Sequence, residues 1–352
     1  MLLEENKPLA PFTTFQIGGP ARWFAEAGTE EEIVEAVGWV RERGVALFVL
    51  GGGSNLLVSD AGFDGLVLHI GIRGVEANRA SDQSSQVTYR VGAGEDWDRF
   101  VSRTVKDNCA GLECLTGIPG TVGGTPVQNV GAYGQEVATA IDCVRTFDLR
   151  QERFVEFTSA ECGFAYRRSR FNTTDRDRFV VTRVDYRLTE GGPPTLRYAE
   201  LQRAFADGMK PPLSDVSAMV RRIRRSKGML IEEDVTDSRS AGSFFKNPVV
   251  SAEDLARIEA ESGRQPPRFL SGPGSANANH AKVPAAWLIE QAGFTKGYAM
   301  GAAGVSTLHT LALVNRGGAT ARDILLLADR ISSSVEQRFG IQLEMEPVLV
   351  GF

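Results

Sequence analysis

One segment of the chain is so rich in glycine that its backbone must follow a tightly shaped loop. Residues 116–134 read TGIPGTVGGTPVQNVGAYG and hold six glycines, whereas 38 glycines in 352 residues would place about two in such a length. Pro119 and Pro126 restrict the backbone while the glycines permit positive φ, so we expect a rigid loop. Such a loop either is shaped around a ligand, to which it presents fixed N–H donors, or is a purely structural turn.

A second glycine cluster follows a strand–helix–strand pattern near the N-terminus. The sequence predicts a strand over 21–27, a helix opened by a Thr29–Glu32 capping box and ended by Gly44, and a buried strand over 45–50. This strand runs into Gly51-Gly52-Gly53-Ser54-Asn55-Leu56. Leu56 occupies the position where a Rossmann fingerprint requires glycine, and no Gly-Lys-Ser/Thr follows to mark a P-loop. Neither common nucleotide-binding motif is present.

Composition narrows the classes of partner. The length predicts two to three domains, and 42% hydrophobic residues are enough for proper cores. Lys plus Arg is 39 against Asp plus Glu 44, and this charge of −5 does not favour nucleic acid or an anionic membrane. No apolar run approaches the roughly 18 residues of a membrane span, and the N-terminus is acidic where a signal peptide is basic. We expect a cytoplasmic protein.

Metal binding is also disfavoured by the sequence. The chain has three widely separated histidines, and its four cysteines show no CxxC pairing. We interpret Cys109, Cys114, Cys143 and Cys162 as small buried side chains and predict no metal site.

The remaining pattern predicts strands first and helices afterwards. Strands are expected at 144–149, 154–157 and 179–188, helices at 212–227, 251–262, 283–292 and 320–339, and a final strand at 341–350. Gly/Pro-rich joints at 191–194 and 210–212 indicate an insertion, after which a further domain begins.

Three further segments concentrate polar side chains in apolar surroundings. They are FAYRRSRF at 164–171, GSFFKNP at 242–248 and LEMEP at 343–347. Each alone has a simpler explanation: Arg167 in a surface ion pair, Ser243 as a helix N-cap, Glu346 on a solvated strand face. The proline after Glu346 interrupts a strand ladder and can aim that carboxylate off the sheet.

Taken together and in this order, the glycine loops, YRRSRF, GSFFKNP, WLIEQ at 287–291 and LEMEP closely resemble the UDP-N-acetylenolpyruvoylglucosamine reductases. The resemblance runs from Thr14 to Gly351. It implies an α+β chain with a two-domain FAD-binding fold of the vanillyl-alcohol oxidase (PCMH) type and a third α/β substrate domain. The expected domains are 1–72 and 73–212 for FAD, with strand 340–352 returning to the active site, and 213–339 for substrate.

The resemblance also implies an activity and its cofactors. Members of this family are NADPH-dependent flavoenzymes that reduce UDP-N-acetylglucosamine enolpyruvate to UDP-N-acetylmuramate, a step in the synthesis of peptidoglycan precursors. Hydride passes from N5 of non-covalent FAD to the enolpyruvyl β-carbon, and Ser243 gives a proton to the α-carbon. Arg167 polarises the substrate carboxylate, a task that suits an always-cationic, bidentate side chain, and Glu346 works beside it.

Cofactor and substrate contacts carry over to matching positions. For FAD these are Gly51, Gly52, Gly53, Ser54, Asn55, Leu56, Gly117, Pro119, Gly120, Thr121, Val122, Gly123, Gly124, Gln128, Asn129, Gly131, Ala132, Tyr133 and Val181. For the UDP-sugar they are Tyr198, Arg224, Lys227, Asn247 and Gln291. Tyr198 matches the members with a tyrosine-bearing loop, and Ser271 to Asn279 is a Gly/Ala/Asn-rich insertion. The resemblance implies a monomer. The alternative function is another FAD-dependent oxidase or dehydrogenase on the same fold.

Overall fold

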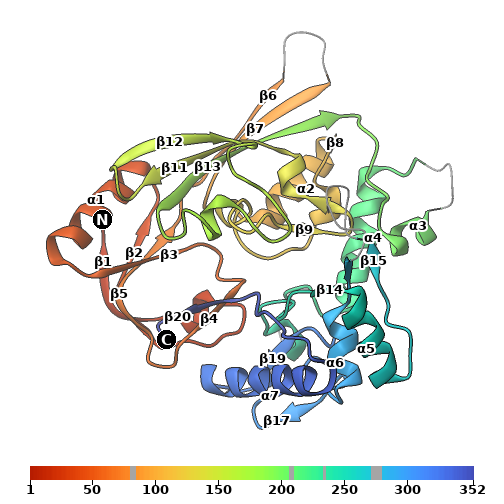
Figure 1. Ribbon diagram of the computed structural model, residues 1–352. Helices are drawn as coiled ribbons and strands as arrows, with labels where there is room; N and C mark the ends of the chain where they lie inside the picture. Colours follow the sequence, from red (N-terminus) through yellow and green to blue (C-terminus); the bar gives the residue numbers. More distant parts are fainter. Residues whose placement is uncertain (80–84, 206–209, 233–234, 271–279) are drawn as a thin grey trace. The chain divides into compact units, whose positions relative to one another are not determined.

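The computed structural model describes residues 1–79, 85–205, 210–232, 235–270 and 280–352 (Figure 1). The insertion Ser271 to Asn279 lies outside these residues. The chain forms two compact units, each built from separate segments. Unit 1 comprises Met1–Lys7, Ala21–Gly53 and Asp64–Arg225, and unit 2 comprises Pro8–Pro20, Ser54–Phe63 and Ser226–Phe352. The domain boundaries expected at 72, 212 and 339 stay a prediction.

A four-stranded sheet with one helix forms the N-terminal part of unit 1. Its order is β1 (Leu3–Pro8), β2 (Pro20–Ala27), β5 (Phe63–Ile70) and β3 (Ala46–Leu50), with β3 and β5 parallel. Helix α1 (Glu30–Arg43) buries Ile33, Ala36 and Val37 in the same core as Leu66 and Leu68 of β5. The expectation that the strand at 45–50 is buried was wrong: β3 is an edge strand, and within it only Leu50 is fully buried.

A larger antiparallel sheet carries the rest of unit 1. Its order is β12 (Arg153–Thr158), β11 (Ile141–Asp148), β13 (Phe179–Glu190), β7 (Gln86–Gly92) and β6 (Val75–Arg79), and β8 (Cys109–Ala110) pairs with the end of β13. Helix α2 (Trp97–Lys106) packs on this sheet through aromatic contacts, with Trp97 and Phe100 at 5.8 and 5.2 Å from the ring of Tyr186. These rings give the loops beside α2 a rigid support.

Two further helices of unit 1 share a small apolar cluster. Helices α3 (Ala199–Ala204) and α4 (Leu213–Ser226) bury Leu201, Val216, Val220 and Ile223 against Cys114. The helix predicted at 212–227 is therefore confirmed as α4. Unit 1 also contains the short strands β9 (Gly131–Ala132) and β10 (Gln135–Glu136) and the 3-10 turns η2 (Glu113–Leu115), η3 (Val122–Gly124), η4 (Val137–Thr139) and η5 (Arg170–Asn172).

Over its described residues, unit 2 combines three small sheets with three helices. The first sheet pairs strand β4 (Leu56–Val58) in parallel with β20 (Val348–Val350). The second consists of β14 (Val249–Ser251), β16 (His280–Lys282) and β15 (Phe269–Leu270). The third consists of β17 (Ala299–Met300), β18 (Ala303–Val305) and β19 (Leu313–Asn315). The helices are α5 (Ala252–Ser262), α6 (Ala285–Gln291) and α7 (Ala321–Phe339), and the turns are η1 (Ala10–Phe12) and η6 (Thr236–Ser238).

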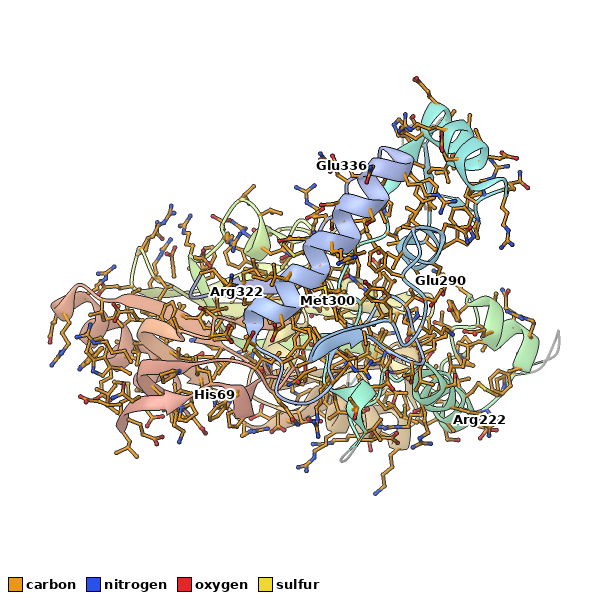
Figure 2. The ribbon with its side chains drawn as sticks, turned by 90° about the horizontal axis from the view of Figure 1, so that it is seen from below. His69, Arg222, Glu290, Met300, Arg322 and Glu336 are labelled. Atoms are coloured by element: carbon orange, nitrogen blue, oxygen red, sulfur yellow. The ribbon has the colours of Figure 1, made fainter. Side chains whose placement is uncertain are left out.

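Helix α7 supplies much of the core of unit 2. One of its faces is buried through Ile324, Leu327, Ile331, Val335 and Phe339, while Arg322 and Glu336 lie near its two ends (Figure 2). None of the helices over the described residues is long and apolar enough to span a bilayer.

Two local expectations need correction. Thr29 accepts a hydrogen bond from the Glu32 N–H as predicted, but the Glu32 carboxylate accepts from Gly28 N–H, so the capping box is shifted by one residue. The final strand is shorter than the predicted 341–350: β20 spans Val348–Val350, and before it the chain forms an isolated bridge between Met345 and Phe245. Pro347, which has no N–H to donate, separates the two pairings.

Candidate active site

The two glycine-rich loops of unit 1 touch each other backbone to backbone. A Cβ on Gly52 would lie 2.5 Å from Gly120 Cα and 2.9 Å from Thr121 N, so only glycine permits this approach. Gly53, Gly117 and Gly120 have φ of 59°, 72° and 118°, which also favours glycine. Residues 51–52 and 120–121 thus share one surface where the two loops meet.

This surface has the character of an anion cradle. A Cβ on Gly51 would lie 3.0 Å from Thr121 Oγ1, and within the described part of the chain this buried hydroxyl has no hydrogen-bond partner. A buried polar atom without a partner is costly unless a ligand or water satisfies it. The residues present therefore fit the pyrophosphate of FAD.

The second glycine loop is fixed by its neighbours. Trp97 donates from its backbone N–H to Gly120 O at 3.1 Å and from its indole to Leu115 O at 3.1 Å. Thr125 Oγ1 lies 2.6 Å from the hydroxyl of buried Tyr186 on β13. These contacts with the sheet and with α2 support the loop on two sides, which agrees with the prediction of a rigid loop.

The loop continues through residues in a strained backbone conformation. Asn129 and Tyr133 have φ of 47° and 50°, and Arg167 on a neighbouring turn has φ of 55°. Such conformations cost of order 1–3 kcal/mol outside glycine and persist where surrounding contacts enforce them. Gln128, Gly131 and Ala132 belong to the same stretch, and Val181 is buried on β13 opposite Thr146.

Arg167 lies at the tip of a tight turn. Ala165 and Arg168 exchange two backbone hydrogen bonds of 2.9 and 3.0 Å, and Arg167 is one of the two residues between them. Its guanidinium donates from Nη1 to Gly131 O at 2.9 Å. The structure therefore joins the predicted catalytic arginine to the predicted flavin loop within unit 1.

Tyr198 and Arg224 lie next to Tyr133 of the same loop. The rings of Tyr133 and Tyr198 are 5.1 Å apart, edge to face. Arg224 on α4 is 8% exposed, hydrogen-bonds to Tyr133 and donates from Nε to Gly117 O at 3.0 Å. Burial lowers the pKa of Arg224, although nearby Tyr133 and Asp98 oppose this shift. A buried cation thus lies against the glycine loop.

A buried carboxylate anchors the segment that leads to Tyr198. Glu113 is fully buried and accepts from Thr195 N at 2.7 Å, Gly111 N at 2.8 Å and Gln135 Nε2 at 2.8 Å. Three N–H donors compensate for the burial of its charge. Glu113 was not among the predicted site residues, since only the fold brings Thr195 to it.

In unit 2, the backbone brings the segments of Ser243 and Glu346 together. Glu346 N donates to Phe244 O at 2.9 Å, and Lys246 N donates to Glu344 O at 2.9 Å. Asn55 adds a side-chain hydrogen bond from Nδ2 to Glu346 O at 3.2 Å, and Val348 N donates to Asn55 O at 2.9 Å. A hydroxyl, a carboxylate and the end of the first glycine loop, residues 54–56, therefore share one part of unit 2.

Two of the predicted substrate residues of unit 2, Asn247 and Gln291, lie at the two ends of α6. Asn247 Oδ1 accepts from Ala285 N at 2.9 Å, where α6 begins, and Gln291 ends this helix. Lys227 lies near His309, whose pKa is lowered to about 4 by burial and by the charges of Lys227 and Lys296. Sequence reasoning missed Lys296 and His309, because no local motif links them to Lys227.

The cysteines are poor nucleophiles in this fold. Burial raises the pKa of all four thiols, to about 11 for Cys143 and about 12 for Cys162. They therefore stay protonated near neutral pH, which lowers their reactivity.

Comparison with known proteins identifies the family. Residues 234–350 match the family model of the UDP-N-acetylenolpyruvoylglucosamine reductase C-terminal domain, and residues 21–150 match that of an FAD binding domain. UDP-N-acetylenolpyruvoylglucosamine reductases from Streptomyces coelicolor and Thermobifida fusca are each 45% identical over 98% of this chain, which covers 90% and 97% of their lengths. The relative from Ralstonia nicotianae is 40% identical, with 99% of both chains covered.

A solved structure agrees with these sequences. The UDP-N-acetylenolpyruvylglucosamine reductase from Thermus caldophilus is 27% identical and superposes with a TM-score of 0.66, covering 99% of this chain and 100% of its own. The predicted α+β fold with FAD-binding domains is confirmed, and the chain is an FAD-dependent oxidoreductase. From its FAD-binding and C-terminal domains and from its relatives over nearly the whole length, the chain belongs to the UDP-N-acetylenolpyruvoylglucosamine reductase family.

Proposed function

We propose that the protein reduces UDP-N-acetylglucosamine enolpyruvate to UDP-N-acetylmuramate with NADPH as reductant. In this proposal it acts as a monomer in the cytoplasm, in the synthesis of peptidoglycan precursors. The observation that supports the proposal is the backbone pairing of 244–246 with 344–346, which brings the chain segments that carry Ser243 and Glu346 together in unit 2. Reduction of an enol ether needs a proton donor for the carbon next to the carboxylate, whereas oxidation of an alcohol does not.

The FAD-binding residues are those of the two loops and the stretch after them. FAD held by these residues would supply the hydride-transfer chemistry that links NADPH to the enolpyruvyl β-carbon. Residues 51–55 and 117–124 would hold its pyrophosphate, and Leu56, Gln128, Asn129, Gly131, Ala132, Tyr133 and Val181 would be further contacts of the cofactor. Two observations support this assignment: the Thr121 hydroxyl has no hydrogen-bond partner among the described residues, and the glycines of the two loops lie in close contact.

Arg167 is assigned to the substrate carboxylate. An enol ether accepts hydride poorly unless the negative charge that develops on the α-carbon and carboxylate is stabilised. A guanidinium can make two parallel hydrogen bonds to a carboxylate and keeps its charge at any physiological pH. The fixed turn of Arg167 supports this role, because stabilisation works best when the donor is already in place.

Ser243 is assigned as the proton donor to the α-carbon. A hydroxyl is a weak acid and can act only from a fixed position within hydrogen-bond reach. Glu346 would stabilise the enol form, and Asn55, which binds the Glu346 carbonyl, would keep that residue in place.

The UDP diphosphate calls for cations and hydroxyl donors. Tyr198, Arg224, Lys227, Asn247 and Gln291 are proposed as substrate contacts. Lys227 and Lys296 both lower the pKa of His309 while Glu290 raises it, so two cations and one carboxylate lie near this histidine and their net charge is positive. Such a region is suited to a diphosphate.

The Ser243→Ala variant tests the assignment through the two half-reactions. NADPH should reduce the bound flavin of this variant at a near-normal rate, because that step needs no proton from Ser243. Reoxidation by UDP-N-acetylglucosamine enolpyruvate should slow by roughly 10²-fold or more. Both rates are measured from flavin absorbance in anaerobic stopped flow. Equal slowing of both would show that Ser243 has another role.

The wild-type protein provides the decisive control for the proposed substrate. Its flavin should bleach with NADPH and recover when the enolpyruvyl substrate is added. A flavin that bleaches and is not reoxidised by this compound would instead favour another oxidoreductase on the same fold.

A further inference from the structure

Three alternate residues of the glycine loop each bind a residue in or next to the turn of Arg167. Val127 O accepts from Ser169 Oγ at 2.6 Å, Asn129 Nδ2 donates to Ala165 O at 3.0 Å, and Gly131 O accepts from Arg167 Nη1 at 2.9 Å. The turn is therefore attached to the loop on both sides of Arg167 and through its guanidinium.

We propose that Ser169 and Asn129 are positioning residues that fix the direction of the Arg167 guanidinium. The inference rests on the proposed function, in which Arg167 stabilises the charge of the substrate carboxylate. Neither side chain needs to touch the substrate for this role. Each acts by holding the turn against the loop.

Ser169 makes hydrogen bonds both to the glycine loop and to the residues that follow the turn. It is 1% exposed, and its hydroxyl accepts from Phe171 N at 3.1 Å while it donates to Val127 O. Its own N–H donates to Asn172 Oδ1 at 2.9 Å, and Asn172 Nδ2 returns to Arg167 O at 3.1 Å. The peptide group of Arg167 is thus held by the same small network that reaches the glycine loop.

Asn129 holds the opposite side of the turn. It is 1% exposed, and its Oδ1 accepts from Ala138 N at 3.2 Å. Its Nδ2 donates both to Ala165 O and to Glu136 Oε2, each at 3.0 Å. Because these two neighbours are acceptors and Ala138 N is a donor, the amide can satisfy all three in only one orientation.

Such support is needed because Arg167 is both strained and long. Its φ of 55° is unfavourable for a residue with a side chain, and an arginine side chain has many rotamers. Without the attachment, the turn would relax and the guanidinium would sample other directions. A misplacement of about 1 Å can cost of order 10²-fold in rate.

The Ser169→Ala variant tests whether the Ser169 hydroxyl positions Arg167, and Thr104→Val is its matched control. Thr104 is likewise buried and donates its hydroxyl to a backbone carbonyl, Val101 O at 2.9 Å, but within α2. We expect Ser169→Ala to slow flavin reoxidation by the enolpyruvyl substrate about tenfold or more, and flavin reduction by NADPH less than about twofold. Thr104→Val should change both rates less than about twofold.

A double-mutant cycle shows whether the effect passes through Arg167. In an Arg167→Lys background, which has no guanidinium to direct, Ser169→Ala should change the reoxidation rate less than about twofold. An equal loss in both backgrounds would overturn the inference. Should Ser169→Ala fail to fold, Asn172→Ala removes the partner of Arg167 O and is expected to give the same split between half-reactions.

A structural readout separates this inference from the proposed function. Crystal structures of the FAD-bound wild type and Ser169→Ala should show the Arg167 Nη1 contact to Gly131 O ordered in the first and lost in the second. If the wild type is not reoxidised by the enolpyruvyl substrate, the proposed function fails, and the crystal structures still decide whether Ser169 positions Arg167. An unchanged guanidinium in Ser169→Ala would refute the positioning role.

Discussion

His309 is a residue whose charge depends on its neighbours in unit 2. Burial lowers its pKa from 6.5 to about 4, and the charges of Lys227 and Lys296 add to this shift while Glu290 opposes it. The folded protein therefore takes up this proton only near pH 4, whereas the unfolded chain takes it up near 6.5. The contribution of His309 to the free energy of unfolding is therefore fully present above pH 6.5. It is lost as the pH is lowered, by about 3 kcal/mol between pH 6.5 and pH 4.

An NMR titration of the three histidines measures this directly. We expect a His309 midpoint near 4 in the wild type and a higher midpoint in Lys296→Gln, because one repelling charge is gone. His309→Gln should lose less unfolding free energy than the wild type between pH 6.5 and 4, measured by urea denaturation at each pH. A wild-type midpoint at or above 6.5 would contradict the described environment of His309.

At the scale of elements, the contact between the two glycine loops strongly restricts which residue can stand at position 52. A Cβ on Gly52 would lie 2.5 Å from Gly120 Cα and 2.8 Å from Gly120 C, and neither backbone atom can swing away as a side chain can. Gly52→Ala should push the loops apart, cost roughly 1–3 kcal/mol of stability and weaken FAD retention. Thermal unfolding and the flavin absorbance that remains after gel filtration measure the two effects.

Gly38→Ala is the matched control for this substitution. Gly38 lies inside α1, and a Cβ there would meet nothing within 4 Å. Alanine is a better helix former than glycine by roughly 0.5–1 kcal/mol, so this variant should melt at a higher temperature than the wild type. The loop contact would be unimportant if both substitutions behaved alike.

Elements with local signals could be predicted from the sequence. Helix α1 ends at Arg43, because Gly44 caps it in the left-handed conformation, and α7 spans nearly the predicted residues because Thr320 caps its start and Gly340 follows its end. Features set by distant partners could not be predicted. The edge position of β3 depends on β5, and the link between Asn55 and Glu346 joins residues 291 positions apart. The same holds for the attachment of Ser169 to Val127 O.

At the scale of the whole molecule, each unit has its own apolar core, and the core of unit 2 needs N-terminal residues. Phe15, Ile17 and Leu57 are buried with side chains from residues 241–341. The Asp60 carboxylate accepts from Ala321 N at 2.7 Å and from Arg322 N at 3.2 Å at the start of α7, where an anion is favourable. Strand β4 is the parallel partner of β20.

Unit 2 should therefore not fold from its C-terminal segment alone. A fragment of residues 226–352 lacks β4, the Asp60 carboxylate and the three buried apolar side chains. Loss of one large buried side chain costs about 2–5 kcal/mol. The loss of all three is therefore comparable to the whole free energy of unfolding of a typical domain, about 5–15 kcal/mol. We expect poor dispersion in a ¹H–¹⁵N NMR spectrum of 226–352. A fragment of residues 1–225, which holds all of unit 1, should give a dispersed spectrum. Cooperative thermal unfolding of 226–352 would contradict this expectation, because it would show that the core of unit 2 forms without the N-terminal segments.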